Sequence, residues 1–150
     1  MPRTVLIVAN RSIGGDALAE AITQRLASEP CHFHLLVPVP VPVSPVVAIG
    51  AAAADMTPTA CFDLRSEREA AQERLDFGIE WLSGFEATAT GELSIEGDTA
   101  VAVGMLVEKH PYDEVIVSTL PTVISRWLHQ DLPHRIGRKV SVPVTVITPT

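Results

Sequence analysis

Cysteine and basic residues are both scarce in this chain of 150 residues. Its two cysteines, Cys31 and Cys61, have no metal-binding spacing and form no CxxC pattern. We therefore expect two small buried side chains in a reducing, cytoplasmic setting. The chain has 11 lysines and arginines but 18 aspartates and glutamates. The resulting formal net charge of −7 excludes a general affinity for nucleic acid or anionic lipid. Any anionic ligand needs a local cationic pocket.

The chain also has no apolar run that could span a bilayer. Its most apolar stretch, residues 35–54, contains four prolines between positions 38 and 45, which remove backbone donors and impose extended geometry. The first residues show no signal-peptide cleavage pattern. Hydrophobic residues make up 47% and charged residues 19% of the chain, as in a compact globule. We expect a single domain over residues 1–150 and no membrane partner.

Strand-like runs alternate with helical patterns along the chain. Five strands are predicted at residues 4–9, 33–37, 88–95, 114–117 and 142–147. Helical spacing of apolar residues predicts helices over 17–27 and 67–83, and another after Gly97-Asp98 with Val101, Met105 and Leu106 on its inner face. This alternation predicts an α/β fold, a doubly wound five-stranded parallel sheet with helices on both faces.

A proline-rich surface loop is expected at about residues 38–65. The alternation of valine and proline at its start favours a stiff, polyproline-like conformation. Ser66, followed three residues later by Glu69, forms a capping-box pattern. This pattern predicts that the loop ends there and that the helix over 67–83 begins.

Polar residues follow two of the predicted strands. Asn10, Arg11 and Ser12 follow the first strand, and Ser118 and Thr119 follow the fourth. In open parallel sheets, ligands bind beyond the carboxyl ends of the strands, where the strand order reverses. These two turns are therefore candidate ligand-binding segments. The alternative is that they are solvated loops with helix caps.

A second polar cluster lies between residues 125 and 135. Arg126 offers a guanidinium that matches phosphate or carboxylate, unless it pairs with Asp131 or a helix end. His129, Asp131 and His134 suggest a small hydrolase or transferase, but one short segment lacks the remaining ligands of a metal site. A nucleophile elbow, a Walker loop and a dinucleotide-binding glycine pattern do not occur. We expect no catalytic residue and no metal.

Three stretches resemble the universal stress protein family, and together they extend over nearly the whole chain. Residues 5–12 line up with that family's opening strand, which usually ends Asp-Gly-Ser. Gly97-Asp98, the helix after it, His110 and the strand at 114–117 resemble the passage from the third to the fourth strand. The end of the chain resembles the family's closing helix and Pro-Val-x-Val-Val strand at Val140, Pro143, Val144, Val146 and Ile147.

The resemblance implies a Rossmann-like sheet of the adenine nucleotide alpha hydrolase type, with strand order 3-2-1-4-5. It also implies a homodimer. In that order the last strand, Val142 to Ile147, is an exposed edge, and antiparallel pairing across a two-fold axis would satisfy its backbone.

ATP-binding members of that family carry Gly-x-x-Gly after the fourth strand, then nine residues and Gly-Ser or Gly-Thr. Counted back from Pro143 without gaps, Val117 and Leu120 take the first two glycine positions, and Gln130 and Asp131 take the last pair. Side chains there would keep backbone amides away from phosphate. Asp131, as the expected N-cap of the last helix, would also repel it. The resemblance implies a regulatory or ligand-binding domain that does not bind ATP in the usual way.

Two other functions stay open. In one, the chain is an ATP- or AMP-binding stress protein with a modified pocket. Asn10, Val37, Ser118 and Thr119 would then line the base and ribose, and Arg126 would replace backbone contacts to phosphate. Asn10 stands where the family has aspartate, and it offers an amide donor and acceptor without a charge. The other is the hydrolase or transferase. No cofactor is expected, although ATP or another anionic ligand stays open.

Overall fold

The computed structural model describes residues 2–10, 12–39, 59–95, 98–120 and 131–148, with only the backbone for 59–66. The described elements, in chain order, are β1 (Arg3–Val8), α1 (Asp16–Ser28), β2 (Cys31–Pro38), α3 (Thr59–Ser83), β3 (Thr88–Ser94), α4 (Thr99–Lys109), β4 (Glu114–Ser118), α6 (Leu132–Lys139) and β5 (Val144–Ile147). The strand predictions are confirmed to within a few residues; the last strand begins later than expected.

The described strands form one parallel sheet in the order β3-β2-β1-β4-β5, which confirms the predicted fold class and strand order. The chain runs from β1 outward through β2 to β3 and then returns to β4 on the other side of β1. Val8 near the end of β1 therefore pairs with Leu36 on one side and with Val117 on the other. The strand order reverses at this point.

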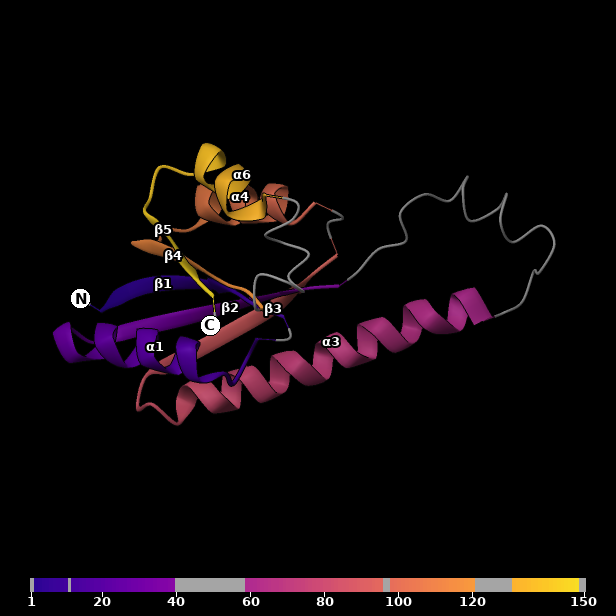
Figure 1. Cartoon of the computed structure of the whole chain (residues 1–150), viewed down its shortest axis with the longest axis horizontal. Coiled ribbons are helices and arrows are strands. Elements are labelled where there is room, and N and C mark those ends of the chain that lie inside the picture. Colours follow the sequence, from indigo (N-terminus) through magenta and orange to yellow (C-terminus); the bar gives the residue numbers. More distant parts are fainter. Residues whose placement is uncertain (1, 11, 40–58, 96–97, 121–130, 149–150) are drawn as a thin grey trace.

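Apolar side chains are buried on both faces of the sheet. α1 and α3 cover one face, and α4 and α6 cover the other (Figure 1). Successive strand residues point to opposite faces, so Ile7 packs in the α1/α3 core while Leu6 and Val8 pack in the α4/α6 core. Burial on both sides explains why the central strands are continuous apolar runs.

α3 begins earlier than the capping-box pattern predicts. It starts at Thr59, so Ser66 lies inside the helix, and the predicted start at 67 is wrong. The pattern is a local signal, and a serine in a helix interior costs only a few tenths of a kcal/mol, about 0.5 or less. The rest of the predicted proline-rich loop, residues 40–58, lies outside the described residues. No helix in the described part of the chain is long and apolar enough to cross a membrane.

α4 begins where the sequence predicts, but the residues that it buries are not the predicted ones. Asp98 is its N-cap, and its carboxylate accepts a hydrogen bond from the Ala100 amide over 3.0 Å. The expected inner residue Met105 is 48% exposed, whereas Ala102 and Val103 are buried. α4 and α6 lie close together where α4 has a small residue. A Cβ added to Gly104 would lie 3.4 Å from the Lys139 Cβ. This close packing decides which stripe of α4 is buried.

Side chains that the sequence leaves without a chemical role have structural partners. Cys31 is buried with a free thiol, as predicted, while the side chain of Cys61 lies outside the described residues. On β2, the ring nitrogen Nδ1 of His32 lies 2.7 Å from Thr88 Oγ1. The corresponding atom of His34 lies 2.7 Å from Thr90 Oγ1. Threonines of β3 therefore satisfy both imidazoles.

Candidate functional site

The carboxyl ends of β1 and β4 lie side by side, as the two polar turns predict. Val8 and Val117 are paired, so the residues that follow each strand meet at the same edge of the sheet. Asn10 and Ser12 come from the β1 side, and Ser118 ends β4. The structure thus brings these three candidate residues together at the reversal of strand order, where open parallel sheets bind ligands.

Two serine hydroxyls join the turn after β1 to the end of β4. Ser12 Oγ donates to the Ser118 carbonyl oxygen over 2.9 Å, and Ser118 Oγ donates to Ser12 Oγ over 2.8 Å. Ser118 is buried and Ser12 is half-buried. These bonds hold the two turns at a fixed separation, and they occupy the hydroxyl protons that a ligand would otherwise accept.

Thr119 and Val37 are both less available to a ligand than the sequence suggests. Thr119 is buried, its amide donates to the Ile147 carbonyl over 2.9 Å, and its Oγ1 lies 2.9 Å from Thr148 Oγ1. Its side chain therefore joins β4 to the end of β5. Val37 is fully buried in the α1/α3 core, so only its backbone could face a ligand.

Arg74 is a site residue that the sequence analysis missed. It lies on α3, and its Nη1 donates to Asn10 Oδ1 over 3.0 Å. Gly78 lets α3 lie close to both β2 and the turn after β1: a Cβ at Gly78 would overlap Leu35 Cδ2 and lie 3.2 Å from Ile13 Cγ2. One helical turn separates Arg74 from Gly78, so both lie on the same side of α3. The four-residue spacing from Gly78 is the only feature of the sequence that points to Arg74. It does not reveal that Asn10 is the partner unless the position of α3 against the sheet is known.

The turn after β1 also requires a glycine. Gly14 has a φ of +87°, a conformation that L-residues with a side chain rarely adopt. The Phe77 ring of α3 lies against it, since a Cβ at Gly14 would be 3.0 Å from Phe77 Cε1. α3 therefore positions the polar turn through both Phe77 and Arg74.

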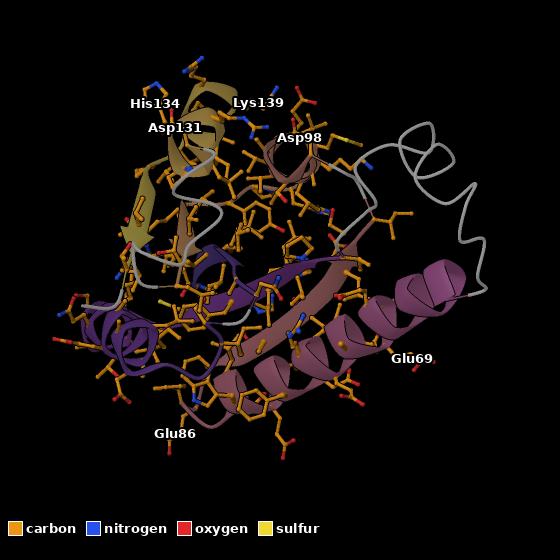
Figure 2. All side chains as sticks on the ribbon, turned by 45° about the vertical axis from the view of Figure 1, so that its right-hand side comes forward. Glu69, Glu86, Asp98, Asp131, His134 and Lys139 are labelled. Carbon is orange, nitrogen blue, oxygen red and sulfur yellow. The ribbon has the colours of Figure 1, made fainter. Side chains whose placement is uncertain are left out.

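Asp131 stands at the N-cap position of α6, but its carboxylate does not cap the helix. Its backbone is left-handed, with φ 56° and ψ 36°, and its side chain makes no capping hydrogen bond in the described helix. The sequence therefore predicts the N-cap position correctly, but an Asp131 side chain that bonds to the helix amides is not found. Arg135, one turn into α6, donates from Nη2 to Oδ1 of Asp98, the N-cap of α4, over 2.5 Å. Figure 2 shows Asp131 and His134 on the outer side of the molecule, at α6.

Val117 takes the first glycine position in the count from Pro143. It lies within β4, and its side chain is fully buried in the α4/α6 core. The gapless count therefore puts the family's first glycine position inside β4. Leu120, at the second position, follows β4 and is half-buried.

Three predicted polar side chains cannot be placed at the site. Arg11, Arg126 and His129 lie outside the described residues. Within the described part of the chain, no group of three or more histidine, cysteine, aspartate or glutamate side chains could hold a metal ion. The site that the structure does describe is therefore a set of neutral donors and acceptors beside one arginine.

The doubly wound sheet, its strand order and the polar edge at the reversal define a Rossmann-like α/β domain. No protein-family model matches the sequence, and no curated protein matches it at the sequence level. Several solved structures are nevertheless similar to the fold over almost the whole chain.

A universal stress protein from Archaeoglobus fulgidus is 12% identical, with a TM-score of 0.58, and the alignment covers 98% of this chain and 94% of that one. A universal stress protein family protein from Arabidopsis thaliana, crystallised with AMP bound, is 12% identical with a TM-score of 0.63 and coverages of 99% and 93%. The A. fulgidus protein in complex with dAMP is 13% identical with a TM-score of 0.58 and covers 98% of each chain. The chain therefore has the universal stress protein fold, which confirms the resemblance found in the sequence.

Proposed function

We propose that this chain is a divergent universal-stress-protein-like regulatory domain that binds a small ligand at the carboxyl ends of β1 and β4 and does not bind ATP in the usual way. The observation that carries the proposal is the polar turn at the strand-order reversal. There Asn10 is held by Arg74, and Ser12 is held by Ser118. Side chains held in place before a ligand arrives lose little conformational entropy on binding. A role in the stress response of the cytoplasm stays a prediction.

Two features speak against a triphosphate at this edge. The Asp131 carboxylate is exposed at the amino end of α6, where the helix amides would otherwise attract phosphate. Even in water, two unit charges of the same sign about 4 Å apart repel by about 1 kcal/mol. The Ser118 hydroxyl is already bonded to Ser12. The described residues therefore favour a small ligand near β1 over an extended one that reaches α6.

A second candidate is an AMP-binding domain with a modified pocket. It is favoured by one observation, that a protein of the same fold from Arabidopsis thaliana has AMP bound. AMP carries one phosphate group and so needs fewer contacts at α6 than ATP does. The hydrolase or transferase has no comparable support from the described residues, where Asp131 and His134 are both exposed.

Melting temperature during titration with ATP, AMP and inorganic phosphate tests these functions. A ligand at a hundred times its dissociation constant adds about 2.7 kcal/mol of stability, or roughly 5–10 °C for a domain of this size. We expect AMP or phosphate to raise the melting temperature more than ATP. Ser12→Ala should weaken the response, and Ser28→Ala, an exposed serine at the end of α1, serves as its control. A shift specific to ATP would refute the proposal, and phosphate release over time would favour the hydrolase.

We also propose a homodimer formed through β5. β5 is an edge strand of the described sheet, and its Val146 is 41% exposed. Antiparallel pairing of two such edges would satisfy their free backbone groups. We expect Val146→Lys to shift the protein toward monomer in sedimentation velocity, because lysine protects strand edges from pairing. Met105→Lys, at a 48% exposed apolar residue of α4, is the matched control and should leave the mass unchanged. A dimer that persists in Val146→Lys contradicts this interface.

A further inference from the structure

Arg74 orients Asn10 at the carboxyl end of β1. The Arg74 Nη1 group donates to Asn10 Oδ1 over 3.0 Å, and both side chains are half-buried. A guanidinium can only donate hydrogen bonds, so the carboxamide must turn its oxygen toward Arg74. The NH₂ group of Asn10 then points to the other side. α3 therefore decides which end of the amide a ligand would meet.

The two side chains together carry more donors than acceptors. A guanidinium has five N–H groups and a carboxamide NH₂ has two, and the bond between them uses only one. Among the described residues, neither side chain makes a further hydrogen bond or ion pair. Helix geometry supplies no carboxylate for Arg74, because its neighbours three and four positions away on α3 are Ala70, Ala71, Phe77 and Gly78. Within the described part of the chain, the pair thus leaves several N–H groups unused and carries one positive charge.

We infer that Arg74 and Asn10 together bind an oxyanion, a carboxylate or phosphate group of a small ligand, at the carboxyl end of β1. The planar fork of an arginine matches such a group with two parallel hydrogen bonds. The position also suits a ligand, because it lies where the strand order reverses. A chain with a net charge of −7 repels anions over most of its surface, so a positive charge at this edge is selective.

The inference rests on the proposed function and adds the chemical class of the ligand to it. The universal stress protein family usually has aspartate where this chain has Asn10. An ionised aspartate can only accept hydrogen bonds from a ligand. Asn10, turned by Arg74, donates them instead. The polarity at the end of β1 is therefore opposite to that of an aspartate-bearing site, and a ligand recognised here must bring acceptors.

Titrations of the full chain with inorganic phosphate, acetate and adenosine test the inference. We expect at least one of the two anions to bind, and we expect uncharged adenosine not to bind more tightly than that anion. Arg74→Gln keeps an N–H donor for Asn10 but removes the charge, so it should raise the dissociation constant of the anion about ten- to hundredfold. Arg68→Gln makes the same change at an exposed arginine of the same helix and should leave the constant unchanged. The stronger response, to phosphate or to acetate, identifies which oxyanion the site prefers.

A second variant reverses the polarity. Asn10→Asp replaces the donor with an acceptor and supplies a carboxylate that pairs with Arg74, so the variant should fold and lose anion binding. A site of the aspartate-bearing kind would instead bind AMP more tightly after this change. The inference is overturned if neither anion binds, if Arg74→Gln binds the anion as the unmodified chain does, or if Asn10→Asp strengthens binding. The ATP titration tests the proposed function separately, so a failure of one is distinguishable from a failure of the other.

Discussion

Replacing Glu114 with glutamine should destabilise the domain more than the same substitution at an exposed glutamate. Glu114 is 4% exposed, and its two carboxylate oxygens accept hydrogen bonds from Arg25 Nε over 2.9 Å and Arg25 Nη2 over 2.6 Å. Thr145 of β5 adds a third at 2.6 Å, and Arg3 Nη2 lies 3.4 Å away. The carboxylate therefore connects β1, α1, β4 and the edge strand. Glutamine has the same size but would turn an NH₂ group toward one of these donors.

The size of the effect follows from the burial of the partners. Removing one member of a buried ion pair costs about 3–5 kcal/mol. The lower end applies here because the Arg25 side chain is 18% exposed and that of Arg3 is 35% exposed, so water can solvate both. A loss of about 3 kcal/mol lowers the melting temperature of a domain of this length by about 6–12 °C.

The cost should also depend on pH. Burial alone raises the pKa of Glu114, but hydrogen bonds from Arg25 and Thr145 and the charges of Arg25 and Arg3 outweigh it, and the folded pKa lies below the ordinary value of 4.5. The unfolded chain therefore binds a proton at a higher pH than the folded chain. The stabilisation is present above the ordinary pKa and is lost as the pH falls through the lowered folded pKa. Because Glu114→Gln has no such group, its difference from the unmodified chain should shrink in acid.

Urea unfolding followed by tryptophan fluorescence, at about pH 7 and about pH 3, measures both effects. Glu29→Gln is the matched control: Glu29 lies 3.3 Å from Arg3 but is 45% exposed, so its loss should cost less than about 1 kcal/mol. The reasoning is refuted if Glu114→Gln lies within about 1 kcal/mol of the unmodified chain at neutral pH, or if its cost is the same at both pH values.

The remaining predictions concern glycine positions and a helix cap, and urea unfolding checks each of them. Gly91→Ala should cost about 1–3 kcal/mol, because the new Cβ would lie 2.6 Å from Leu75 Cδ1 and 2.9 Å from the Leu35 carbonyl oxygen, which is backbone and cannot move aside. Gly137→Ala, on α6 with nothing within 4 Å of the new Cβ, should instead stabilise the domain by about 0.5–1 kcal/mol. Changes of the same sign in the free energy of unfolding for the two substitutions would contradict this packing. Asp98→Ala removes the capping hydrogen bond of α4 and the contact with Arg135 Nη2, and it should cost about 1 kcal/mol or more; an unchanged stability would contradict a stabilising role for Asp98.

The fold could be predicted because its signals are repeated along the chain. Strands buried on both faces must be apolar throughout, and a parallel sheet needs a helix between strands, so the alternation of patterns predicts the layers. The errors occur where a single local signal was used. A serine can sit inside a helix as well as cap it, which is why the start of α3 differs from the one predicted at Ser66. The face of α4 depends on how closely α6 packs against it, and the spacing of Met105 carries no information about that distance.

The candidate site divides in the same way, between contacts that the topology dictates and contacts that depend on helix docking. Ser12 and Ser118 meet because the carboxyl ends of neighbouring parallel strands share an edge, whatever covers the sheet. Arg74 and Asn10 are 64 positions apart, and they meet only because Gly78 lets α3 lie against the turn after β1. A bulkier residue at 78 would move the helix away from the sheet and take the guanidinium with it. The charge at this edge is therefore set by the packing of a small residue one helical turn away, and no pattern of polar residues in the sequence could have revealed it.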